Sequence, residues 1–99
     1  MHFVFDAELY RWAARADSSW YFVAVPREFS DEIRQIPRVP RGFGAVRVEA
    51  EVAGLTWRTS IFPGEADGAY SLPIKRAVRE RAAAGEGDAI RVALTVLDG

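Results

Sequence analysis

The sequence predicts one mainly β domain with two short helices, and two patterns carry that prediction. Apolar residues alternate with polar ones over Ala45–Ala53 and again over Asp88–Val96, and this period of two is typical of half-buried strands. Each alternating run follows a proline, a stretch of apolar residues at helical spacing and a glycine, an order that predicts strand, helix, turn and strand. The 99 residues are 49% hydrophobic, enough for one core, so we expect a single domain over residues 1–99.

The first half is predicted to hold two strands, a helix and a third strand. Phe3–Trp12 alternates and predicts the first strand, and Trp20–Val25 is an apolar run typical of a buried strand. A helix should follow over Arg27–Ile36, with two alternatives for its start: Pro26 takes the first helical position, or Ser30 caps a shorter helix. A loop rich in proline and glycine then leads to the alternating strand.

The second half is predicted to have the same order of elements. Gly54 marks a turn into Leu55–Phe62, which we expect to pair with the preceding strand as a hairpin. Pro63–Gly68 concentrates turn-forming residues and predicts a loop before a short strand, Tyr70–Leu72. The second helix, which two glycines should end, is predicted from apolar residues at Ile74, Ala77, Val78 and Ala82.

The agreement between the halves predicts an internal repeat, over about residues 1–53 and 54–99. Aligning Pro26 with Pro73 places a short helix after each proline, and Gly44–Val52 aligns with Asp88–Val96 with identical residues at several positions. Neither half could bury a sheet face alone. We therefore expect the halves to interleave in one closed or split barrel.

The unit of strand, proline, helix, glycine and alternating strand resembles the module of AbrB-like proteins, whose intertwined chains form a double-split β-barrel. The whole sequence more specifically resembles the bacterial and archaeal family called domain of unknown function 1905. The residues that carry this resemblance are Phe5 to Leu9, Trp20, Val25-Pro26, Val46 to Val52 with Gly54, Ser60, Pro63, Asp67-Gly68, Leu72, Arg79 and Gly87-Asp88. The resemblance implies a six-stranded double-split β-barrel with no assigned activity.

Composition excludes several classes of function. The net charge is −1, from 13 basic and 14 acidic residues, which argues against a surface that is positive all round. The chain has no cysteine, which excludes disulfides and thiolate metal sites and favours a cytoplasmic location. Its first residues lack a secretory pattern, and no apolar run approaches the ~20 residues of a membrane span, so we expect no membrane contact.

No motif predicts catalysis, a cofactor or a metal, so we expect none of the three. His2 is the only histidine, and a terminal residue is a poor member of a Ser-His-Asp triad because chain ends fray. Glu65 and Asp67 form a tight acidic pair, but two carboxylates are too few for a hard cation. An enzyme that uses Asp67 and Asp88 as acid and base is a weaker alternative, because the sequence offers them no partner.

The function expected from the sequence is that of a small, soluble, non-catalytic binding or interaction module, monomeric or homodimeric, whose partner is a small molecule or a protein. The residues that could converge on a concave binding site are Trp57, Arg58, Tyr70, Lys75, Arg76 and Arg79. Nucleic-acid binding of the AbrB-like type is the alternative, and the arginines near both helices favour it. Acidic residues on the outward faces of two strands, which would repel phosphates, argue against it; they are Asp6, Glu8, Glu49 and Glu51.

Overall fold

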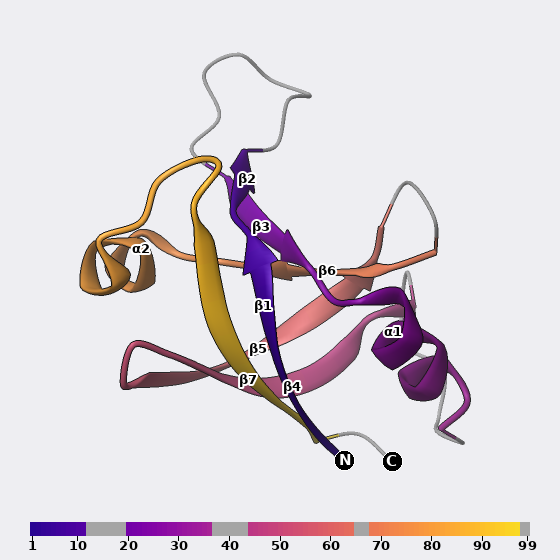
Figure 1. Ribbon diagram of the computed structural model, residues 1–99. Helices are drawn as coiled ribbons and strands as arrows, with labels where there is room; N and C mark the ends of the chain where they lie inside the picture. The colour runs from indigo at the N-terminus through magenta and orange to yellow at the C-terminus, as the bar shows by residue number, and fades with distance from the viewer. Residues whose placement is uncertain (12–19, 37–43, 65–67, 98–99) are drawn as a thin grey trace.

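The computed structural model describes residues 1–11, 20–36, 44–64 and 68–97, and in these residues an antiparallel sheet curls around the core with a helix at either side (Figure 1). The elements are β1 His2–Glu8, β2 Tyr10–Arg11, β3 Tyr21–Ala24, α1 Arg27–Arg34, β4 Val46–Val52, β5 Leu55–Pro63, β6 Tyr70–Pro73, α2 Arg76–Ala82 and β7 Ala89–Val96. Neighbouring strands follow the order β1-β7-β4-β5-β6-β3-β2. The prediction of a mainly β protein with two short helices is confirmed.

The first strand is divided in two, so the described residues contain seven strands and the expected number of six is wrong. β1 pairs with β7, whereas β2 pairs with β3. Between them the backbone N–H of Leu9 donates to the carbonyl of Asp88 at 2.8 Å, and the carbonyl of Leu9 accepts from the N–H of Gly87 at 2.7 Å. Apolar residues keep their period of two through Leu9, so the pattern gives no sign that the strand changes partners there. Trp12, the expected end of this strand, lies outside the described residues.

β4 and β5 form the predicted hairpin. Val52 pairs with Leu55, and the two residues between them both have positive φ, 53° at Ala53 and 82° at Gly54. This is the backbone of a type I′ turn, whose twist matches that of the flanking strands. The inward-facing residues of β4 are all buried, as the alternation predicts; they are Val46, Val48, Ala50 and Val52.

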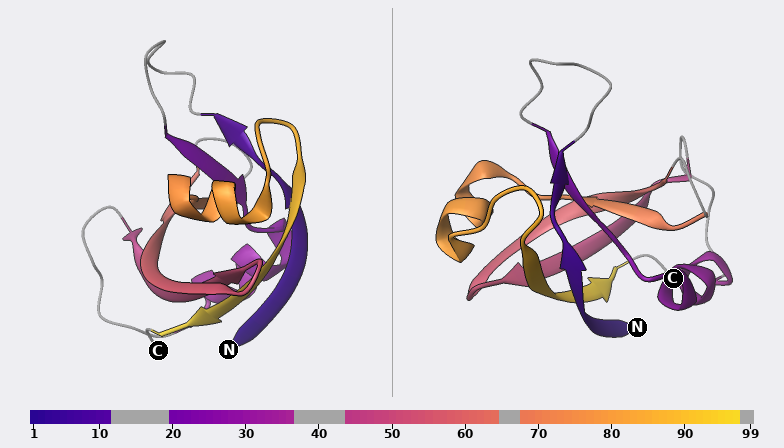
Figure 2. Two further views of the ribbon diagram at one scale, coloured as in Figure 1. Left: turned by 90° about the vertical axis from the view of Figure 1, so that its left-hand side faces the viewer. Right: turned by 45° about the horizontal axis from the view of Figure 1, so that its top comes forward.

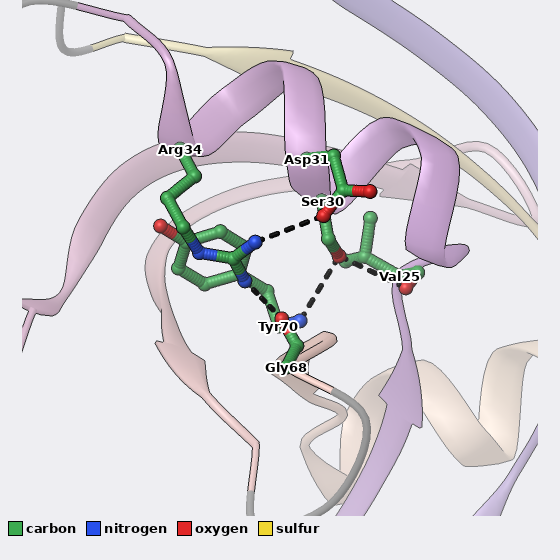
Figure 3. A network of polar contacts seen from close by, with 6 residues as sticks. All are labelled: Val25, Ser30, Asp31, Arg34, Gly68 and Tyr70. Carbon is green, nitrogen blue, oxygen red and sulfur yellow. Dashed lines mark hydrogen bonds and ion pairs between the residues drawn. The ribbon is translucent and has the colours of Figure 1, made fainter.

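Helix α1 begins at Arg27. Pro26 is its N-cap and not its first helical residue, with a ψ of 142°, and the alternative start at Ser30 is wrong. Ser30 is instead fully buried in the helix (Figure 3). Its hydroxyl donates to the carbonyl of Val25 at 3.1 Å and accepts from the backbone N–H of Tyr70 at 3.0 Å. The hydroxyl therefore joins α1 to β6. It also forms hydrogen bonds with two buried backbone groups, and burying such groups without a hydrogen bond would lower the stability of the fold.

A second set of contacts ties the end of α1 to the start of β6. Arg34 donates to the Oδ1 atom of Asp31 at 3.0 Å and also to the carbonyl of Gly68. Its guanidinium lies 5.3 Å from the centre of the Tyr70 ring, and Figure 3 shows the two side chains face to face. On the apolar side of the helix, the Phe29 ring stacks on Phe3 of β1 with a centroid separation of 4.6 Å.

Helix α2 lies on the opposite side of the curled sheet from α1 in Figure 1, as the right-hand view of Figure 2 also shows. It buries Val78, but Ala77, which was expected on the apolar stripe, is exposed. It ends at Ala83, which has a φ of 53° and a ψ of 41°, before either of the glycines expected to end it. Within the described part of the chain, no helix is long and apolar enough to cross a membrane.

Candidate binding cleft

An open cleft of about 740 Å³ lies where the end of β2 and the start of β3 meet the middle of β5, the end of β6 and the first turns of α2. We call it the basic cleft because of the cations that line it, which are Arg11, Arg58, Lys75, Arg76 and Arg79. Its aromatic walls are Trp20, Tyr21 and Trp57. No aspartate or glutamate lines the cleft among the described residues.

The structure brings together five of the six residues that the sequence singled out, since Trp57, Arg58, Lys75, Arg76 and Arg79 all line the basic cleft. It does not bring Tyr70 to them. Tyr70 is 2% exposed and lies at the other helix, against Ser30 and Arg34 (Figure 3). The reason is that Tyr70 and Leu72 share the inward face of β6, whereas the cleft opens at the far end of that strand.

Sequence reasoning missed the cationic and aromatic residues at the ends of β2 and β3 that line the cleft: Arg11, Trp20 and Tyr21. They reach it because β3 pairs with β6, which sets Phe22 opposite Pro73 and so carries Tyr21 to the start of α2. This contact joins distant parts of the chain. The sequence does show an aromatic pair at the start of β3 and a basic residue at the end of β2. No local pattern, however, indicates that these residues lie near α2.

Arg79 is held in the cleft by neutral groups. Its Nη1 atom donates to the carbonyl of Ile74 at 2.9 Å, and its guanidinium lies 4.0 Å from the centre of the Tyr21 ring. Among the described residues, no carboxylate forms an ion pair with it. A guanidinium has five N–H donors, and a cation over a tyrosine ring keeps its full charge. Arg79 is thus oriented without being neutralised.

The other cations of the cleft differ in their partners. The Lys75 ammonium lies 5.9 Å from the centre of the Trp57 ring, and no ion pair joins it to a described carboxylate. Arg58 pairs with Glu49 across the hairpin at 3.4 Å, and Arg76 pairs with Glu80 one helical turn away at 2.9 Å. Both pairs are largely exposed. Exposed pairs of this kind contribute about 0–1 kcal/mol, so a competing anion can displace them.

The basic cleft offers electrostatic attraction through its cations and stacking through its aromatic rings. Its described lining contains no carboxylate, histidine or thiol, which are the usual general acids, bases and nucleophiles. Asp88 holds the turn after α2 by accepting from the backbone N–H of Gly85 at 2.8 Å, while Glu65 and Asp67 lie outside the described residues. No cluster of three or more histidine or acidic side chains with metal-binding geometry occurs among the residues described.

A charge pair elsewhere on the sheet shows how a paired cation differs from Arg79. Asp6 on β1 and Arg91 on β7 lie opposite each other, and the Nε atom of Arg91 donates to Oδ1 of Asp6 at 3.0 Å. This hydrogen bond and the guanidinium charge hold the pKa of Asp6 below its usual value, and the same contacts raise the pKa of Arg91. The carboxylate balances the charge of Arg91, so Arg91 offers less attraction to a further anion than Arg79 or Lys75.

Comparison with known proteins identifies the family without identifying an activity. The profile of a family described as a domain of unknown function (DUF1905) matches residues 5–94, which is most of the chain. No curated protein matches the sequence significantly. The resemblance stated from the order of the sequence motifs is thereby confirmed, and the chain belongs to the domain of unknown function 1905 family.

Proposed function

We propose that this protein is a non-catalytic binding module that holds an anionic ligand in the basic cleft. The observation that carries the proposal is the state of Arg79 and Lys75. Both side chains are positioned by a carbonyl or an aromatic ring, and neither has an ion pair with a described carboxylate. A cation that is oriented but not neutralised attracts an anion and loses little side-chain freedom when the anion binds.

The shape of the cleft and its lining support a ligand rather than a substrate undergoing reaction. An open space of about 740 Å³ is within the range of small-molecule sites. Its walls supply cations for negative groups and rings for flat or apolar groups, and the described lining holds no histidine, carboxylate or thiol. An enzyme based on Asp88 has less support, because that carboxylate is already hydrogen-bonded within its turn.

The test uses sodium tripolyphosphate as a compact polyanion and measures its affinity by isothermal titration calorimetry at low salt. We expect Lys75→Met and Arg79→Met each to lower the affinity about fivefold to tenfold, as the loss of a charged contact of about 1–1.4 kcal/mol would. Arg81→Met is the matched control, because it removes the same charge from an exposed residue of α2 that does not line the cleft. Equal affinity in the wild type and the Lys75→Met/Arg79→Met double variant would refute the proposal.

The double-split barrel built from two repeated halves is our proposal for the finer architecture. Its support is that β5 pairs with β4 over most of its length and with β6 at Phe62–Pro63, just as the first strand pairs with β7 through β1 and with β3 through β2. Binding of duplex DNA in the AbrB-like manner is the alternative function. It has less support, because the outer face of β4 presents Glu51 and that of β1 presents Asp6, both of them exposed.

A further inference from the structure

A row of three aromatic side chains runs along the outer face of β2 and β3 and ends at the basic cleft. We call Tyr10, Phe22 and Trp20 the aromatic strip. The Tyr10 and Phe22 ring centres are 5.9 Å apart, and those of Phe22 and Trp20 are 6.3 Å apart. Trp20 also lines the cleft, so the strip and the cleft form one continuous surface.

The strip is too exposed to be explained by core packing. Trp20 is 60% exposed and Tyr10 is 37% exposed, although large aromatic side chains usually bury most of their surface. The strip is nevertheless ordered by contacts beyond its own rings, because a hydrogen bond of 3.0 Å joins the Tyr10 hydroxyl to the Ser71 hydroxyl on β6. Fixed aromatic rings in a row beside a cationic groove are the features with which proteins bind unpaired nucleotides.

We propose that the aromatic strip and the basic cleft together bind single-stranded nucleic acid, with bases stacked on the strip and phosphates held by the cations of the cleft. This inference rests on the proposed function of the cleft and names its ligand. Stacking needs only the flat face of a base, so binding should depend weakly on sequence. Phosphate contacts with Lys75 and Arg79 should make the affinity fall steeply as salt rises.

The arrangement favours a single strand over the other polyanions that the cleft could attract. A mononucleotide has one base, whereas the strip offers three successive rings. In a duplex the faces of the bases are covered by their neighbours, so the exposed ring of Trp20 would have nothing to stack on. An acidic peptide would satisfy the cations but would give no reason for an aromatic row beside them.

The experiment measures fluorescence anisotropy of labelled oligonucleotides with the full chain at low salt. The probes are a strand of about 12 thymidines, within the site sizes known for stacking domains, and an abasic strand with the same number of phosphates. We expect the abasic strand to bind about tenfold more weakly or worse, because it lacks the stacking contribution. The affinity for the thymidine strand should fall with salt, and Lys75→Met should reduce the slope by about 0.7.

Variants at Trp20 separate stacking from simple apolar contact. Trp20→Leu keeps apolar surface but removes the ring face, and we expect about a tenfold loss for the thymidine strand and no change for the abasic strand. Trp20→Phe keeps a ring and should retain most of the affinity. Because Trp20 is largely exposed, both variants should fold, and circular dichroism with a thermal melt verifies this.

Each contrary outcome overturns the inference in a distinguishable way. Equal affinity for the thymidine and abasic strands would show that base stacking does not contribute to binding and that the cleft binds any polyanion. Tripolyphosphate binding without binding of either strand would overturn the inference while the proposed function stands. Tighter binding of a duplex of the same length would favour the AbrB-like alternative. Self-association in analytical ultracentrifugation that Trp20→Leu abolishes, without oligonucleotide binding, would make the strip a homodimer interface.

Discussion

The two corners where a helix meets the sheet share their backbone contacts and differ in one side chain. At the first corner, the N–H of Val25 donates to the carbonyl of Tyr70 at 2.8 Å; at the second, the N–H of Ile74 donates to the carbonyl of Tyr21 at 2.8 Å. These bonds relate Val25 to Ile74 rather than to Leu72, the residue paired with it when the two prolines are aligned. Each tyrosine ring also carries an arginine, Arg34 over Tyr70 and Arg79 over Tyr21.

The side chain that binds the carbonyl before each helix separates the two corners. The hydroxyl of Ser30 binds the carbonyl of Val25 at 3.1 Å, and the guanidinium of Arg79 binds the carbonyl of Ile74 at 2.9 Å. The hydroxyl is short, so the chain closes over it and Ser30 has no exposed surface. The guanidinium is long and charged, so its corner stays open as the basic cleft. The residue that binds this carbonyl, Ser30 in one corner and Arg79 in the other, thus makes the first corner structural and the second a candidate for binding.

The largest effect is expected from Ser30→Ala. The substitution removes the buried hydrogen bonds that the hydroxyl makes with the carbonyl of Val25 and the N–H of Tyr70, at about 1–3 kcal/mol for each bond. We therefore expect the free energy of unfolding to fall by about 2–6 kcal/mol in urea titrations. The equivalent change at the second corner, Arg79→Met, should cost less than about 1 kcal/mol, because water reaches this half-buried corner. Equal losses at the two corners would contradict the comparison.

The two arginines that lie over tyrosine rings, Arg34 and Arg79, should affect different properties of the protein. Arg34→Met removes the contacts with Asp31, Gly68 and the Tyr70 ring, so it should lower the free energy of unfolding by about 0.5–1 kcal/mol. It should leave the affinity for tripolyphosphate unchanged, whereas Arg79→Met should weaken that affinity. Calorimetry and urea titration on the same two proteins measure both quantities. A loss of affinity in Arg34→Met would show that the first corner also binds anions.

The ends of the two helices offer a smaller test. Ala83 ends α2 in the left-handed region, whereas Gln35 ends α1 at a φ of −82°. Glycine adopts the left-handed conformation without the penalty of a Cβ atom. We expect Ala83→Gly to raise the free energy of unfolding by about 0.5–1 kcal/mol, and Gln35→Gly, the matched control, to lower it slightly. If Ala83→Gly lowered the stability, the helix would not end as described.

The smallest effect concerns the paired charges outside both corners. Because Arg91 lowers the pKa of Asp6 in the folded state, this carboxylate stabilises the fold above its unfolded pKa of about 4, and the contribution is lost as pH falls through the lower folded pKa. Arg91→Ala should return the pKa of Asp6 to its usual range. A carboxyl NMR titration measures the change, with Arg47→Ala as the control. An unshifted Asp6 in the wild type would mean that the pair does not form in solution.

The elements were predictable where the signal is local. The period of two identified β4 and β7, the turn at Gly54 identified the hairpin, and Pro26 marked the start of α1. The division of the first strand at Leu9 was not predictable, because a change of partner leaves the alternation intact. The early end of α2 at Ala83 was also hidden, since the helix stops before the glycines that would normally mark its end.

The candidate site was predictable in part for the same reason. Trp57 and Arg58 belong to one strand and Lys75, Arg76 and Arg79 to one helical segment, so local spacing already grouped them. Tyr70 was grouped with them on residue type, and the sequence could not show that its side chain is buried, with its ring under Arg34.

The amino-acid sequence by itself determined which segments become strands and helices and which residue types each one presents, because hydrophobic period and turn chemistry act over a few neighbouring residues. Only the tertiary structure decided that Tyr21 lies under Arg79 and that Ser30 is buried against Tyr70. Both contacts depend on the pairing of β3 with β6, strands far apart in the chain. The sequence therefore supplied the cations and rings, and the long-range pairing left one corner closed and the other open.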